Sequence, residues 1–106
     1  MVKYLYNTSG NWIAFQVNKY IFNKNGKWIG WIPWNNDIVM SKDGHYLGTI
    51  YQNNRLLFNL HQTFLPYPGY PGYPGYPGYP GYPGFAGYAG YIYGTRDLTD
   101  EELELN

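Results

Sequence analysis

Glycine occupies every third position from residue 69 to residue 90, and this unbroken repeat limits the possible folds of the chain more than any other feature. Most of the triplets read Gly-Tyr-Pro, and the last ones carry Ala or Ile in the place of Pro. Proline fixes its own φ at about −65° and biases the residue before it toward extended backbone, so we expect an extended polyproline II segment. Over residues 66–90 such a segment would span roughly 75 Å.

Three roles are open for this repeat: a spacer, an ordered rod or bundle formed with the repeats of other chains, and a ligand tail for a proline-recognising domain. Glycine at every third place is typical of collagen, in which only glycine fits the axis of three wound chains. A tyrosine in nearly every triplet favours stacking over a solvated spacer. No arginine flanks a Pro-x-x-Pro motif in the array, which disfavours the ligand tail. We therefore predict that the repeat self-associates through Gly69, Tyr70, Gly72, Tyr73, Gly75, Tyr76, Gly78, Tyr79, Gly81 and Tyr82.

The chain divides into a head at residues 1–65, the repeat at 66–94 and an acidic segment at 95–106. A head of about 65 residues is marginally stable alone, and the chain has no cysteine to staple it. Oligomerisation is then the expected support. The head is rich in lysine and the end of the chain in acidic residues, so the two should attract each other within or between chains.

Short hairpins account for the head. The segments NTSGNWIAF (7–15), NKNGKWIGW (23–31) and SKDGHYLGT (41–49) align without gaps, each with a polar turn that ends in glycine. Asn-Gly and Asp-Gly at such places predict tight turns with positive φ at both central residues, and a fourth turn is expected at Asn53-Asn54. The pattern predicts an all-β antiparallel meander or small barrel. Its expected strands cover 2–6, 11–17, 19–23, 27–32, 37–41, 45–51 and 55–59.

These strands carry apolar residues on both faces. Alternation places Trp28 and Gly30 on one face of the same strand and Trp31 on the other. An antiparallel sheet normally wets one face, so one apolar face here must meet the repeat, another subunit or a ligand. Ala14, Gly30 and Gly48 occupy one place in each hairpin, which predicts close packing of an aromatic ring or a neighbouring chain. We expect the head to self-associate through Trp12, Trp28, Gly30 and Trp31.

The signature NGKWIGWI followed by KDGHYLGTI resembles the 4-fold beta flower proteins, over about residues 3–58. The resemblance implies hairpins arranged like petals about a four-fold axis, either within one chain or between subunits. It implies no chemistry, and the glycine repeat lies outside it. A four-fold head conflicts with a three-chain rod, whereas a looser bundle of polyproline II segments fits both.

The sequence contains no recognisable catalytic constellation, and we expect no catalytic residue, cofactor or metal. Neither His45 nor His61 lies in a sequence motif that would place it beside a catalytic nucleophile, and Asp43 belongs to a predicted turn. Thr99 and Glu102 have the spacing of a capping box, which predicts a short C-terminal helix. The amino terminus has no signal-peptide pattern and no apolar run is long enough to cross a membrane, so cytoplasmic residence is the default expectation, with assembly outside the cell left open.

We therefore expect a non-enzymatic structural protein that forms homo-oligomers, with a fibre or stalk as one form that the assembly could take. The alternative is a binding module that stacks a polysaccharide, or less favourably single-stranded nucleic acid, on exposed tryptophan. Trp34 is the candidate ring, because the Pro33–Asn36 loop cannot bury it easily.

Overall fold

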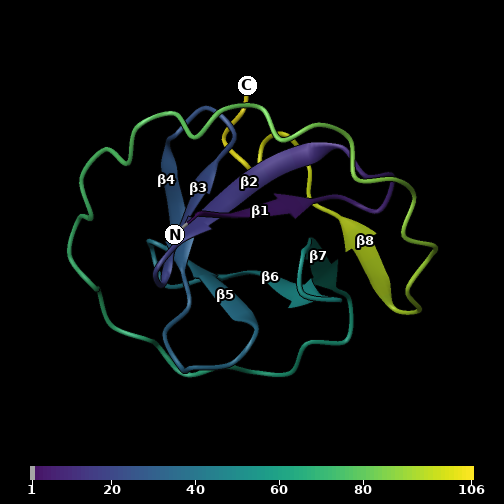
Figure 1. The fold of residues 1–106 in the computed structure, drawn as a ribbon. Helices are drawn as coiled ribbons and strands as arrows, with labels where there is room; N and C mark the ends of the chain where they lie inside the picture. Colours follow the sequence, from purple (N-terminus) through teal and green to yellow (C-terminus); the bar gives the residue numbers. More distant parts are fainter. Residues whose placement is uncertain (1) are drawn as a thin grey trace.

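Eight strands follow one another in chain order around a sheet that closes on itself (Figure 1). In this computed structural model, which describes residues 2–106, the closing contact is the parallel pairing of Tyr6 with Arg55. The Tyr6 amide also donates to the carbonyl of Asn54 at 2.8 Å. Seven strands thus form a barrel and the eighth lies on its edge. They are β1 (Val2–Tyr6), β2 (Trp12–Val17), β3 (Tyr20–Asn23), β4 (Trp28–Trp31), β5 (Ile38–Ser41), β6 (Tyr46–Tyr51), β7 (Arg55–Asn59) and β8 (Thr95–Asp97).

The all-β prediction is confirmed, and each of the seven predicted strands lies within one residue of its expected bounds. The turn geometry is different from the expectation. In the first three hairpins only the glycine that ends the turn, Gly10, Gly26 or Gly44, has positive φ, and the residue before it does not. Each glycine amide donates to the residue three positions earlier, and a bulge follows in each strand pair. These hairpins therefore have three-residue loops that end in a glycine bulge, rather than the expected two-residue turns.

Each turn starts with a polar side chain that fixes it. Asn23 Oδ1 accepts a hydrogen bond from the Lys27 amide at 3.0 Å. Asn7 Oδ1 does the same for Asn11 at 2.9 Å, and Ser41 Oγ for His45 at 3.1 Å. The repeat seen in the sequence is therefore a repeat of hydrogen bonding. The fourth predicted turn lies one residue earlier than expected, with positive φ at Gln52 and Asn53.

A fourth hairpin of the same kind begins at Asn59 and is interrupted by the glycine repeat. Asn59 Oδ1 accepts from the His61 amide at 2.9 Å, as Asn23 Oδ1 accepts from Asn25. The chain then leaves the barrel and returns at β8, where Thr95 pairs with Asn59. Residues 60–94 are thus one long insertion in the hairpin β7–β8. The four hairpins β1–β2, β3–β4, β5–β6 and β7–β8 belong to a single chain.

The barrel is apolar inside and out. Its interior is mainly aliphatic and includes Leu98 and Leu103, which follow β8 and are 8 % and 1 % exposed. A second cluster of buried aromatic residues consists of Trp12, Phe15, Phe22 and Trp28. The segment 95–106 therefore shares the core of the head.

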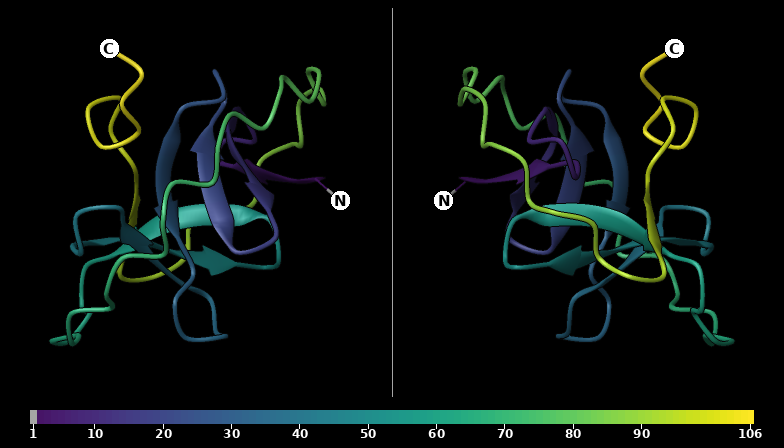
Figure 2. Two further views of the ribbon diagram at one scale, coloured as in Figure 1. Left: turned by 90° about the vertical axis from the view of Figure 1, so that its left-hand side faces the viewer. Right: turned by 90° about the vertical axis from the view of Figure 1, so that its right-hand side faces the viewer.

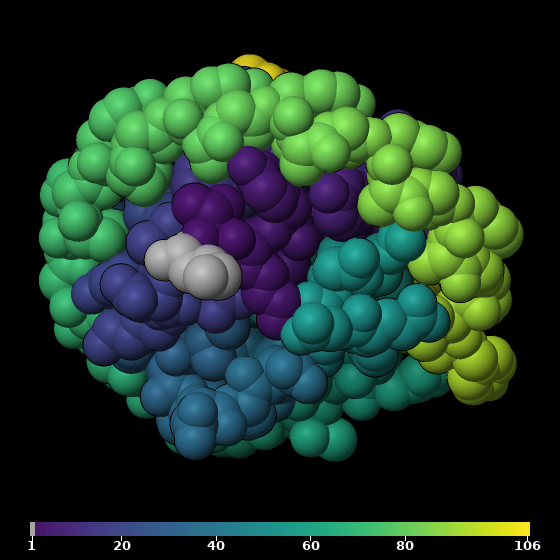
Figure 3. All heavy atoms as spheres, viewed as in Figure 1, coloured from purple at the N-terminus to yellow at the C-terminus, as the bar shows by residue number. Residues whose placement is uncertain are grey.

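The repeat, residues 66–94, runs around the outside of the barrel, and we call it the strap (Figures 1 and 2). In Figure 3 its atoms form a green rim along the strands. The predicted polyproline II rod is wrong. Every glycine from Gly69 to Gly90 has φ between 80° and 90°, whereas polyproline II needs negative φ throughout, so the chain bends at each triplet. The molecule measures only 35 × 34 × 26 Å.

The predicted C-terminal helix is also wrong, although its capping box exists. The Glu102 amide donates to Thr99 Oγ1 at 3.1 Å, and the Thr99 amide donates to Glu102 Oε1 at 2.9 Å. The turn ends at Glu104, whose φ is 56°, because Asn23 Nδ2 binds the carbonyl oxygens of Leu103 and Glu104. Glu104 also pairs with Lys27 at 2.7 Å, so head and acidic end attract each other within the chain. No helix in residues 2–106 is long and apolar enough to cross a membrane.

Candidate functional site: the strap and its cavities

Two tyrosines of the strap lie against each tryptophan at the base of a hairpin. The rings of Tyr70 and Tyr73 lie 5.7 and 5.8 Å from Trp28, at interplanar angles of 59° and 60°. Tyr79 and Tyr82 lie 5.9 Å from Trp12, at angles of 57° and 55°. The second pair is nine residues after the first. Three glycine triplets therefore correspond to one hairpin of the barrel.

The same nine-residue step recurs at the hairpin turns. A Cβ atom added to Gly44 would lie 2.5 Å from the Tyr67 ring, and one added to Gly26 would lie 3.0 Å from the Tyr76 ring. At the first hairpin the strap backbone itself comes this close, since a Cβ on Gly10 would lie 2.3 Å from the Gly87 carbonyl oxygen. The glycine of each turn thus leaves room for the strap as well as adopting positive φ.

Hydrogen bonds fix the last third of the strap. The amides of Ala86 and Ala89 each donate at 2.9 Å to the first hairpin turn, at the carbonyl oxygens of Gly10 and Thr8. Arg55 is 6 % exposed, and its Nη1 donates to the carbonyl oxygens of Asn7 at 2.9 Å and Gly87 at 3.0 Å. This guanidinium joins the barrel closure to the strap, and sequence reasoning did not find it because its partners are backbone atoms of distant residues.

The strap presents a belt of aromatic rings to solvent. Its tyrosines and Phe85 are 60–87 % exposed, including those that cover tryptophans. The exposed rings are Tyr67, Tyr70, Tyr73, Tyr76, Tyr79, Tyr82, Phe85, Tyr88, Tyr91 and Tyr93. A group of exposed aromatic rings of this size is typical of interaction surfaces.

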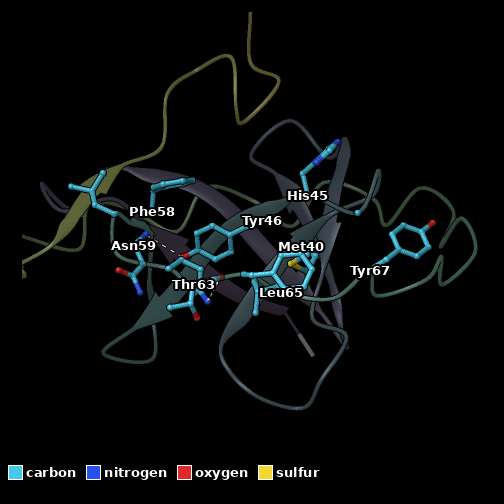
Figure 4. A pocket seen from close by; sticks show the side chains of 12 residues that line it. Met40, His45, Tyr46, Phe58, Asn59, Thr63, Leu65 and Tyr67 are labelled. Carbon is cyan, nitrogen blue, oxygen red and sulfur yellow. Dashed lines mark hydrogen bonds between the residues drawn. The ribbon is translucent and has the colours of Figure 1, made fainter.

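Cavities lie between strap and barrel at three successive hairpins. The cavity at the first hairpin, of about 530 Å³, is lined by Trp12, Tyr79 and Tyr82 among others. The cavity at the second hairpin, of about 600 Å³, is lined by Trp28, Tyr70 and Tyr73 among others. The third, also about 600 Å³, lies at the hairpin β5–β6 and is lined by Tyr46 and Tyr67 among others. Figure 4 shows Met40, Tyr46, Thr63 and Leu65 gathered around it.

The positions equivalent to the tryptophans differ in the other two hairpins. In the second hairpin Trp28 is the cross-strand partner of Phe22. The residue in the place of Trp28 is Tyr46 in the third hairpin, where it pairs with Met40, and Arg96 in the fourth, where it pairs with Phe58. The Arg96 guanidinium lies 4.1 Å from the Phe58 ring centre and binds Glu102 through two hydrogen bonds of 2.8 and 2.9 Å. These bonds lower the pKa of the Glu102 carboxyl and raise the pKa of Arg96.

The residues predicted for self-association of the head are covered by the chain itself. Trp12, Trp28 and Trp31 are 6–7 % exposed. A Cβ on Gly30 would lie 2.5 Å from the Met40 carbonyl oxygen, so the close approach predicted there is made by the neighbouring strand β5. Trp34 is half-buried in the loop between β4 and β5. None of these residues is brought together with the others as one exposed surface.

The predicted strap residues form one array in which the tyrosines and the glycines have different roles. The tyrosines contact the barrel and keep more than half of their surface in solvent. The glycines from Gly69 to Gly90 have nothing within 4 Å of an added Cβ, so they provide the left-handed backbone rather than a crowded contact. Of the two histidines, His45 lines the third cavity and His61 stacks on Tyr93.

The comparisons with known proteins agree with this repeated architecture. No curated protein and no solved structure gives a significant match to the chain. A family model described as 4-fold beta flower protein matches residues 2–99, so the likeness extends beyond the head through the strap and β8. The chain belongs to the 4-fold beta flower family.

Proposed function

We propose that this chain is a non-enzymatic assembly protein whose strap rings bind other copies of the chain. The observation that carries the proposal is the belt of strap rings, each 60–87 % exposed. Tyrosine rings supply large apolar contact area together with a hydroxyl for hydrogen bonding, which suits them to interfaces. A formal net charge of zero leaves little repulsion between copies.

Of the two regions expected from the sequence to self-associate, the proposal keeps the strap and leaves out the head. The strap covers the outer aromatic cluster of its own barrel, so an uncovered head face no longer calls for a partner. The strap's outward surface takes over this role. Assembly through such a belt fits a fibre or stalk, since the rings continue around much of the barrel.

Sedimentation velocity over a range of protein concentrations tests the proposal. We expect the average mass to rise with concentration, and to rise less in a variant that replaces four belt rings by serine. These four rings, Tyr76, Phe85, Tyr88 and Tyr91, do not stack on a tryptophan of the barrel. Circular dichroism of the variant serves as the control for folding. A wild-type chain that stays monomeric at every concentration would falsify the proposal.

A binding role for Trp34 is the second candidate. It is the one tryptophan not buried. A cavity of about 390 Å³ is lined by its chain neighbours Pro33 and Asn35 but not by Trp34 itself. Tryptophan fluorescence titrated with glycans and with single-stranded oligonucleotides distinguishes it from assembly. If a ligand binds and Trp34→Ala abolishes binding while the sedimentation profile is unchanged, the binding role is the better account.

A further inference from the structure

The third hairpin, β5–β6, lacks the pair of rings that covers the tryptophan in the first two. Nine residues before Tyr70 and Tyr73, the strap register places His61 and Phe64. His61 stacks instead on Tyr93, with ring centres 6.1 Å apart, and Phe64 is 91 % exposed. Tyr46, which stands in the place of the tryptophan, is only half-buried.

The other end of the strap has the opposite mismatch. Tyr88 and Tyr91 lie nine residues after Tyr79 and Tyr82, so they are in register for a further tryptophan. In the fourth hairpin that place is taken by Arg96, whose guanidinium already stacks on Phe58. Among residues 2–106 no ring pairs with Tyr88 or Tyr91, which are 71 % and 65 % exposed.

The site at the third hairpin is held in place before any ligand arrives. The Tyr46 hydroxyl is hydrogen-bonded to Thr49 and accepts from the Asn59 amide at 3.1 Å (Figure 4). Its ring lies 5.1 Å from Phe58. The adjoining cavity of about 600 Å³ has a mixed lining, in which the apolar Met40 and Leu65 lie beside the polar His45 and Thr63. The cavity and the Tyr46 ring are thus in place in the free chain, as is usual for binding sites.

We propose that the third-hairpin cavity binds a Tyr-x-Gly-Tyr segment, and that Tyr88 and Tyr91 of a second copy supply it. The chain itself shows the binding mode twice, because Tyr70-Pro-Gly-Tyr73 and Tyr79-Pro-Gly-Tyr82 cover the equivalent ring of their hairpins. Tyr88-Ala-Gly-Tyr91 has the same spacing. This contact names the partner surfaces of the proposed assembly and, as a contact between copies, rests on that function.

The contact is head-to-tail, because the surface that binds and the surface that is bound differ. Interfaces of this kind form open filaments unless the rotation between copies closes a ring. Each copy has one free site and one free pair, so the arrangement permits growth at both ends.

Two variants that each block one half of the contact test the proposal. Thr63→Arg places a long cation at the mouth of the cavity from an exposed position, and Tyr88→Ser with Tyr91→Ser removes the pair. We expect each variant alone to be monomeric by sedimentation and an equimolar mixture to form a dimer that grows no further. Val2→Ser, which removes an exposed apolar side chain outside the strap and away from the cavity, is the control and should assemble like the wild-type chain.

A peptide of residues 86–92 provides a readout that does not depend on assembly. We expect it to bind the wild-type chain in calorimetry, with at least tenfold weaker binding to the Thr63→Arg variant and no binding of the peptide with both tyrosines replaced by alanine. If both blocking variants assemble like the wild type, and the peptide does not bind, the proposed contact is wrong while the assembly function stands. If the wild type is monomeric and the peptide binds, the site is real and the assembly function is wrong.

Discussion

Replacing Gly75 by alanine should lower the free energy of unfolding by about 1 kcal/mol. Its φ is 85°, and an added Cβ would meet nothing within 4 Å, so no steric clash contributes. Left-handed backbone costs an L-residue roughly 1–2 kcal/mol. Alanine in place of glycine recovers roughly 0.4–1 kcal/mol by restricting the unfolded chain. Urea unfolding followed by tryptophan fluorescence measures the difference, because Tyr73, two residues before Gly75, lies against Trp28.

Gly10→Ala is the matched comparison, because Gly10 also has positive φ but an added Cβ there would clash with a neighbouring atom. At φ 94° the new Cβ would lie 2.3 Å from the Gly87 carbonyl oxygen, so we expect a loss of about 3 kcal/mol or more, or detachment of the strap. If Gly75→Ala were equally costly, the glycine would sit at a crowded contact, as in collagen. If Gly75→Ala were stabilising, its backbone would not be left-handed. Either result would refute the described role of the strap glycines.

Three further predictions follow from single contacts. Trp28→Ala should cost about 3–5 kcal/mol in urea unfolding, because it empties the space between barrel and strap. Arg55→Met should speed amide hydrogen exchange near Gly87 and cost about 3 kcal/mol, because two hydrogen bonds from a buried cation are lost. The hydrogen bonds from Arg96 lower the pKa of Glu102 in the folded chain, so the pair stabilises the fold above the ordinary glutamate pKa, and this stabilisation is lost as the pH falls through the lower folded pKa. The loss in the free energy of unfolding should stay below about 1 kcal/mol because the pair is partly exposed. Acid unfolding of the Glu102→Gln variant should lack this loss.

The strands could be predicted because their signals are local. A polar residue, a glycine and an alternating apolar run lie within a few positions of one another, and these groups hydrogen-bond to each other in the folded hairpins. The eighth strand could not be predicted in this way. Thr95–Asp97 has no apolar alternation, and its partner Asn59 lies on the far side of the strap insertion. Only the likeness of Asn59 to Asn7 and Asn23 could have revealed a fourth hairpin.

The conformation of the strap could not be inferred from proline alone. Proline sets the geometry of its own residue and the one before it, but glycine adopts either sign of φ with nearly equal ease. The choice is made by the barrel, which offers Trp12 and Trp28 as apolar surfaces to cover. The sequence did indicate that one apolar face needed a cover, and the strap of the same chain provides it.

The strict phase of the glycines has a physical reason that differs from the one in collagen. In collagen glycine is required because only the smallest residue fits where three chains meet at an axis. In the strap glycine is required because the backbone bends at every third residue with positive φ. Because three bends advance the strap by one hairpin, deleting a single residue between Tyr73 and Tyr79 would draw Tyr79 and Tyr82 away from Trp12 while Tyr70 and Tyr73 stay on Trp28. The phase is thus constrained by the spacing of the barrel hairpins within one chain. The outward surfaces of the rings carry no such constraint and stay exposed to solvent.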